Sequence, residues 1–168
     1  MKDSNHLLND QQAIERIFDH IDNNTTDLGD ETWKEPVENY FSQERFKQEI
    51  QLLRRLPVPF CPSAALPEKG SYVARQASGT PLLTVRGSDG EVRSFINACR
   101  HRGMQVAQGM GCSNKAFVCP YHAWSYSLDG KLKNIPGEEA FPNYNKSDNG
   151  LVQLDAVEKG GIIYVQQE

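Results

Sequence analysis

The sequence lacks long hydrophobic runs and any excess of basic residues. No apolar stretch approaches the ~18 residues that a membrane-spanning helix needs. The N-terminal segment MKDSNHLLNDQQ has neither the apolar region nor the small-residue cleavage site of a signal peptide. We therefore expect a cytoplasmic protein without a membrane partner. A net charge of −4 gives no support to nucleic-acid binding, which requires a basic surface.

Cysteine is also scarce, because the 168 residues contain only four. In a reducing compartment these cysteines are not expected to form a structural disulfide, so roles as metal ligands come first. Cys112 matches no ligand motif, and we interpret it as a loop cysteine. Cys61 lies between Pro59 and Pro62, and we interpret it as a packing residue. The remaining two are Cys99 and Cys119.

The first third of the chain has helical periodicity. Within residues 1–24, apolar residues recur every three or four positions, which predicts an amphipathic helix capped by Asn9 or Asp10. A second such pattern, SQERFKQEIQLLRRL, begins at the candidate N-cap Ser42 and is ended by Pro57. The apolar positions are Leu7, Leu8, Ile14, Ile17, Phe18 and Ile21 in the first helix and Phe46, Ile50, Leu53 and Leu56 in the second.

From residue 66 the hydrophobic period changes from 3.6 to 2, which indicates short strands. Tight turns such as Asp129-Gly130 separate them. The long loop 134–150 interrupts the series, and loops of this length usually serve a function or cover another element. Many short strands without intervening helices predict a mainly β fold, an antiparallel sandwich or barrel preceded by N-terminal α-helices. The expected strands are 71–76, 81–87, 91–98, 115–119, 124–128, 131–133, 151–157 and 161–166.

Two short motifs each pair a cysteine with a histidine: CRH at 99–101 and, after seventeen residues, CPYH at 119–122. Each motif follows a predicted strand, where a hairpin loop would begin. Structural zinc sites usually pair like with like, cysteines in one loop and histidines in the other, whereas both loops here are mixed. A two-iron cluster explains this better, because two facing loops would present both cysteines to one iron and both histidines to the other.

The two motifs resemble the cluster loops of the Rieske domain in Rieske non-haem iron oxygenases, the α subunits of ring-hydroxylating systems. The resemblance rests on CRHRG and CPYHAWSY. It extends over about residues 40–168 through FSQERFKQEIQLL, LPEKGSY, VRGSDGEVRSFINACRHRG, GKLKNIPGEEAFPNYNKSDNGLV and GGIIYV. It implies a Rieske 2Fe-2S cluster, with Cys99 and Cys119 on one iron and His101 and His122 on the other. It also implies a Rieske domain over residues 41–168, with a cluster-binding subdomain, after a helical extension at 1–40.

A few positions separate this chain from the respiratory Rieske proteins. Met104 and Tyr121 stand where those proteins carry a disulfide, and Trp124 stands where they place a serine hydroxyl near a cluster sulfide. Losing that hydrogen bond removes stabilisation of the added electron, so we expect a reduction potential at the low end of the Rieske range. Ala123 occupies a position where glycine is common, and it costs ~1 kcal/mol if the backbone there has a positive φ.

The resemblance implies one-electron transfer within an oxidoreductase, a ring-hydroxylating dioxygenase or monooxygenase of aromatic hydrocarbon catabolism. In this family a ferredoxin or flavin reductase donates the electron. A mononuclear iron in a separate, larger catalytic domain accepts it. The chain stops at YVQQE, where that domain would begin. We therefore expect no mononuclear iron and no catalytic residue in this chain, and a parent protein that forms a trimer.

Two other interpretations stay open at this point. The first is a free-standing Rieske-type ferredoxin that serves a separate oxygenase. The N-terminal helices and the GEEAFPNY segment argue against it, because ordinary Rieske ferredoxins are shorter. The second is a zinc-stabilised interaction module with no redox role.

Overall fold

The computed structural model describes residues 8–168, and the chain divides after Tyr40 into two units. In the first unit, helix α1 (Asp10–Asn23) begins with a capping box. The Asn9 side chain accepts a hydrogen bond from the Gln12 N–H (2.9 Å), and the Gln12 side chain accepts one from the Asn9 N–H (3.0 Å). The predicted helix and its Asn9 cap are confirmed, while Leu7 lies outside the described residues.

Helix α2 (Gln43–Arg55) opens the second unit. Its N-cap is Ser42, as predicted, and Pro57 follows its end. The carbonyl of Arg54 accepts a hydrogen bond from the Gln167 N–H (2.9 Å), and the Arg54 side chain donates one to the Ser78 carbonyl (3.1 Å). The last turn of α2 is therefore fastened to the rest of this unit. Within residues 8–168, neither α-helix has the length and apolarity that crossing a membrane requires.

Ten antiparallel strands form two sheets in the second unit, so the predicted mainly β, antiparallel architecture is confirmed. The large sheet has seven strands in the order β1-β10-β9-β4-β3-β2-β5, and the small sheet has three in the order β6-β7-β8. The strands are β1 (Val58–Pro62), β2 (Ser71–Ala77), β3 (Thr80–Arg86), β4 (Val92–Ile96), β5 (Gly109–Cys112), β6 (Ala116–Val118), β7 (Ser125–Ser127), β8 (Leu132–Asn134), β9 (Gln153–Lys159) and β10 (Ile162–Gln166). Short 3₁₀ helices lie at Val37–Tyr40, Ser63–Ala65, Glu138–Ala140 and Lys146–Asp148.

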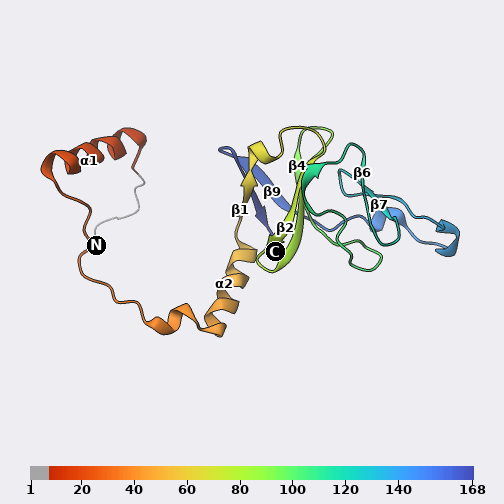
Figure 1. The fold of residues 1–168 in the computed structure, drawn as a ribbon, viewed down its shortest axis with the longest axis horizontal. Coiled ribbons are helices and arrows are strands. Elements are labelled where there is room, and N and C mark those ends of the chain that lie inside the picture. The colour runs from red at the N-terminus through yellow and green to blue at the C-terminus, as the bar shows by residue number, and fades with distance from the viewer. Residues whose placement is uncertain (1–7) are drawn as a thin grey trace. The chain divides into compact units, whose positions relative to one another are not determined.

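Two hydrophobic clusters fill the second unit. One lies under β1, β2, β3 and β10 of the large sheet. The other joins the large sheet to the small one, which Figure 1 shows with β6 and β7 beside the strands β2 and β4. Cys99, Cys119 and Trp124 belong to this second cluster, so both cysteine loops lie where the two sheets meet. Its other buried members are Ala74, Leu83, Val85, Phe95, Val106, Phe117, Tyr126, Leu128, Leu132, Ile135 and Leu151.

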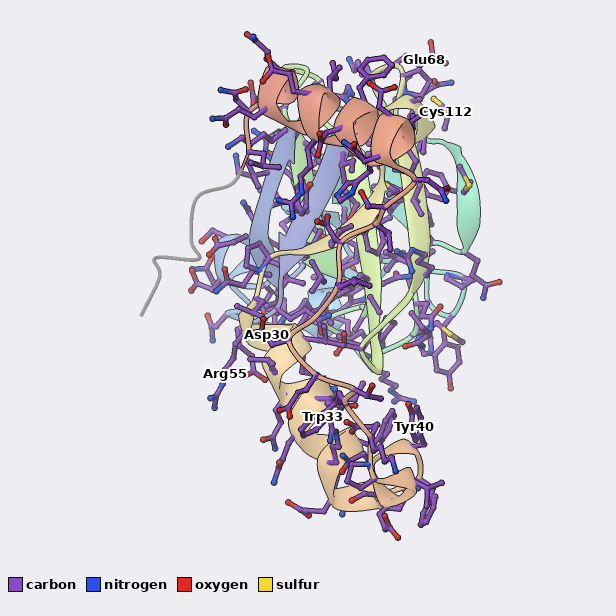
Figure 2. All side chains as sticks on the ribbon, turned by 90° about the vertical axis from the view of Figure 1, so that its left-hand side faces the viewer. Asp30, Trp33, Tyr40, Arg55, Glu68 and Cys112 are labelled. Carbon is purple, nitrogen blue, oxygen red and sulfur yellow. The ribbon has the colours of Figure 1, made fainter. Side chains whose placement is uncertain are left out.

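Two strands were not predicted, and both lie at the edges of the large sheet. β1 contains two prolines and β5 reads Gly-Met-Gly-Cys, compositions that strands tolerate mainly at edges. Cys112 is the last residue of β5, so its prediction as a loop cysteine is wrong. Figure 2 shows its side chain at the surface near Glu68, and its thiol lies 3.5 Å from the Lys69 carbonyl.

The turn between β7 and β8 is packed directly against the large sheet. Gly130 has φ +81°, and a β-carbon there would lie 2.8 Å from Cζ of the buried Phe95. We expect Gly130→Ala to lower the free energy of unfolding by about 2–4 kcal/mol, through both strained backbone and overpacking. Gly90→Ala is the matched control, because Gly90 has φ +87° but open space around it; it should cost about 1 kcal/mol. Urea denaturation of both variants tests this, and equal losses would contradict it.

A bidentate ion pair joins β3 to β9. The Arg86 guanidinium donates two hydrogen bonds of 2.9 Å to Glu158 and lowers the pKa of that carboxyl to about 2. Because this pKa lies below the unfolded value of about 4.3, the pair stabilises the fold above that pH and loses its effect as pH falls toward 2.

We therefore expect Glu158→Gln to cost about 1 kcal/mol at pH 7, a value reduced for the exposure of the pair, and almost nothing near pH 2. Urea midpoints at the two pH values measure the difference. Glu139→Gln is the control, since within residues 8–168 no hydrogen bond to the Glu139 side chain is found. A cost for Glu158→Gln that is equal at both pH values would refute the linkage.

Candidate metal centre

The first cysteine–histidine motif lies in the connection between β4 and β5. The Cys99 N–H donates to the Met104 carbonyl and the Gly103 N–H donates to the Cys99 carbonyl, both at 2.8 Å. These two bonds fold residues 99–104 into a tight turn. The turn points the Cys99 side chain into the core, where the residue is 3% exposed, and leaves His101 half-buried.

The second motif lies in the hairpin between β6 and β7. The Cys119 N–H donates to the Trp124 carbonyl (2.8 Å), and the Ala123 N–H donates to the Cys119 carbonyl (3.0 Å). Ala123 has φ +55°, so this position does require the left-handed conformation in which glycine is favoured. The alanine costs about 1 kcal/mol there. Cys119 is 3% exposed, while His122 is exposed.

The structure brings the four predicted ligand residues together as two pairs, one of cysteines and one of histidines. The thiols of Cys99 and Cys119 are free, buried neighbours in one core cluster. Burial raises the pKa of the Cys99 thiol, and the adjacent Cys119 adds to that effect. The rings of His101 and His122 are also neighbours, with centroids 4.6 Å apart.

The two histidines differ in their surroundings. The His101 ring stacks on Trp124 with centroids 4.9 Å apart and planes 9° apart, and Phe141 meets it edge-on at 6.1 Å. Phe141 and Tyr144 both come from the long loop 134–150, and both contact Trp124. The long loop therefore covers the His101 side of the site. The His122 ring contacts only the exposed Tyr121 and His101 among the aromatic rings of the described residues.

A metal group fits these residues, because His101 has an unused ligand atom. Its Nδ1 is buried and has no hydrogen-bond partner among the described residues. Buried polar atoms in native proteins are almost always paired, so this nitrogen needs a partner that the protein itself does not supply. Burial and the charge of His122 also lower the pKa of the His101 imidazole, which keeps the ring in the neutral form that metals bind. Two buried sulfurs and two neighbouring imidazoles match the donor set of a Rieske cluster.

Tyr126, which was not among the predicted site residues, contacts one of the candidate ligands. Its hydroxyl lies 3.2 Å from the Cys99 sulfur and accepts a hydrogen bond from the Arg100 N–H (2.9 Å). The hydroxyl accepts from Arg100 through a lone pair, so its single proton remains available for the sulfur. The sequence did carry a signal for Tyr126, because it follows Trp124 by two positions in the strand predicted at 124–128, which places both on the same face. In the structure β7 begins at Ser125, and both Trp124 and Tyr126 are buried.

The two remaining cysteines lie away from the site. Cys112 is exposed at the end of the edge strand β5. Cys61 is half-buried in β1 and packs against the other hydrophobic cluster, as predicted. Neither belongs to the loops that carry the four candidate ligands.

The chain belongs to the Rieske [2Fe-2S] domain family, whose profile matches residues 57–145. The cofactor of this family is a 2Fe-2S cluster, which replaces the zinc interpretation. The fold predicted from the resemblance is confirmed.

The relatives found are oxygenases and their subunits. Biphenyl 2,3-dioxygenase subunit alpha of Rhodococcus jostii (strain RHA1) is 38% identical over 100 residues, which are 59% of this chain and 22% of that protein. The carnitine monooxygenase oxygenase subunit of Escherichia coli (strain K12) is 31% identical over 139 residues, which are 82% of this chain and 37% of that protein. The structure of naphthalene 1,2-dioxygenase from Rhodococcus sp. bound to indole has a TM-score of 0.75 at 29% identity and covers 96% of this chain and 36% of that one.

This chain therefore spans less than two fifths of the length of each of these relatives (22%, 37% and 36%). It is a Rieske domain of the kind found in oxygenase α subunits. These relatives favour the oxygenase interpretation over a free-standing ferredoxin.

We expect Tyr126→Phe to lower the reduction potential of the reconstituted protein by on the order of 50 mV. This shift corresponds to the free energy of about one hydrogen bond to a charged sulfur. The hydroxyl proton stabilises the additional negative charge of the reduced state, and phenylalanine removes it without emptying the space. Redox titration followed by visible absorption measures the shift. Tyr164→Phe, in β10 of the large sheet, is the control and should leave the potential unchanged. An unchanged potential in Tyr126→Phe would show that the hydroxyl does not bond the sulfur.

Proposed function

We propose that this chain transfers single electrons through a Rieske cluster, with Cys99 and Cys119 on one iron and His101 and His122 on the other. The observation that carries the proposal is the arrangement of these side chains on two loops: a pair of buried thiols and a pair of adjoining imidazoles, of which His122 is exposed. When bound, a cluster with two neutral imidazole ligands accepts and releases one electron, and does so more readily than one with four thiolates.

The surrounding residues enclose the His101 side of the site and leave the His122 side open to solvent. Trp124 and Phe141 keep water from the His101 ring, and the core keeps water from both thiols. His122 lies at the surface, so we propose its ring edge as the point where electrons pass to and from partners. Arg100 and Arg102 are exposed in the adjoining loop and would attract an acidic partner to this edge.

We further propose the domain boundaries and the partners. Residues 41–168 are the Rieske domain and residues 1–40 a helical extension, which agrees with the division of the chain after Tyr40. A ferredoxin or flavin reductase donates the electron, and a mononuclear iron in an oxygenase catalytic domain accepts it. A structure of the related quaternary ammonium Rieske monooxygenase was described as giving insight into inter-subunit electron transfer. It supports a multimeric parent protein, for which we propose a trimer.

For the whole oxygenase we propose hydroxylation of an aromatic substrate, supported by the 38% identity to the biphenyl dioxygenase subunit. A quaternary ammonium substrate is the second candidate, because the match to the carnitine monooxygenase subunit covers 82% of this chain. We also propose a potential at the low end of the Rieske range. The buried Trp124 brings no hydroxyl to the site, so the potential-raising bond of the respiratory proteins has no counterpart at this position.

Iron analysis and electron paramagnetic resonance of the reduced protein test the proposal. We expect His101→Ala and His122→Ala each to abolish the visible charge-transfer bands, because either change removes half of the protein ligands of one iron. Protein purified without air or chelators should contain iron and acid-labile sulfide in equal amounts.

Cys112→Ser and Cys61→Ser are the matched controls, since both cysteines lie outside the two loops. Both variants should keep the wild-type spectrum. A coloured protein that survives both histidine changes, or a cluster that disappears in Cys112→Ser, would show that the ligands are assigned wrongly.

A further inference from the structure

The two cluster loops are closed at their bases in different ways. The second loop leaves β6 and enters β7, and these strands pair with each other, so the Val118–Ser125 pair closes it. The first loop leaves β4 and leads to β5. In the described sheet β4 lies between β3 and β9, and β5 pairs with β2. No strand pairing therefore closes the first loop.

The side chain of Asn97 takes the place of that pairing. Its Oδ1 accepts hydrogen bonds from the N–H groups of Val106 (2.9 Å) and Ala107 (3.4 Å), and its Nδ2 donates to the Ala107 carbonyl (2.8 Å). Its own backbone N–H donates to the Pro81 carbonyl, at the start of β3 (2.8 Å). Asn97 thus ties the far end of the loop to its near end, and ties both to the large sheet.

A carboxamide suits this position because it carries an acceptor and a donor on one planar group, as a peptide unit of a neighbouring strand would. Asn97 is 1% exposed and Val106 is 7% exposed. Water cannot readily replace these bonds, and a buried peptide group left without a partner is costly. The three hydrogen bonds together therefore hold residues 97 and 107 at a fixed distance from each other.

We propose that Asn97 is a positioning residue of the metal centre. A single residue, Ala98, separates it from Cys99, so the position of the Asn97 clamp sets where the Cys99 sulfur and the His101 ring face the second loop. Its side-chain hydrogen bonds go to the backbone of Val106 and Ala107 and not to a ligand, so Asn97 acts through the backbone of the loop. This role rests on the proposed function, because it concerns how the four ligands are held for one cluster.

The test compares Asn97→Leu with Thr84→Val in the full 168-residue chain carrying its cluster. Leucine has the shape of asparagine and forms none of the three hydrogen bonds. Thr84 is equally buried, and its hydroxyl bonds only Ser94, within the large sheet, in the described part of the chain (2.9 Å). Both variants lose buried hydrogen bonds, but only one loses them at a cluster loop.

We expect loss of visible absorption in the presence of a chelator to be about tenfold faster in Asn97→Leu than in Thr84→Val, the effect of two net hydrogen bonds. The midpoint potential and the g-values of the reduced Asn97→Leu protein should also shift, while those of Thr84→Val stay at wild-type values. Equal bleaching rates with unchanged g-values would overturn the positioning role. Wild-type protein without a Rieske spectrum would instead overturn the proposed function, and this role with it.

Hydrogen exchange in the wild-type holoprotein keeps the proposal testable if Asn97→Leu does not fold. The amides of Val106 and Ala107 lie outside any strand, yet the clamp should protect them from exchange as strongly as the amides of β4. Rapid exchange at both amides, with β4 protected, would show that Asn97 does not close the loop.

Discussion

The central feature of this structure is a group of sulfur and nitrogen donor atoms that the fold removes from water. The described part of the chain does not supply a hydrogen-bond partner for all of them. Two thiols lie in the core, and the Nδ1 of His101 is buried with no hydrogen bond within residues 8–168. Buried thiols are well tolerated, but a buried polar nitrogen without a partner is costly. The family to which the chain belongs carries a 2Fe-2S cluster, which is the partner that we propose for this nitrogen. A cofactor that binds this nitrogen would therefore also stabilise the folded chain.

The junction of the two sheets explains how the donors are held. The hydrophobic cluster between the sheets contains both cysteines, and the Gly130 turn packs against Phe95 to keep the small sheet in place. The two cluster loops are closed by different interactions. Strand pairing closes the loop of Cys119, whereas a buried side chain closes the loop of Cys99. The aromatic residues of the long loop enclose one histidine and leave the other open, which gives the site an inner and an outer side.

Much of this architecture follows from local sequence pattern. The capped helices, the alternating strands and the Asp129-Gly130 turn were predicted because each depends on neighbouring residues along the chain. The two edge strands were missed for the same reason. Val58–Pro62 and Gly109–Cys112 have compositions that disfavour strands, and they are strands only because β10 and β2 offer them hydrogen-bonding partners.

The proposed ligand set could be predicted from the sequence, since the CRH and CPYH motifs and their positions at strand ends indicate two facing mixed loops. The contacts that surround these donor atoms and hold their loops could not be predicted from the sequence, because they form only in the tertiary structure. The contact of Tyr126 with Cys99 joins residues 27 positions apart, and the clamp from Asn97 reaches nine and ten positions along the chain. Which histidine is covered depends on a loop that returns to Trp124 from residues 141 and 144. These contacts are set by how the sheets pack, because no periodicity along the chain encodes the distance between side chains that meet only after folding.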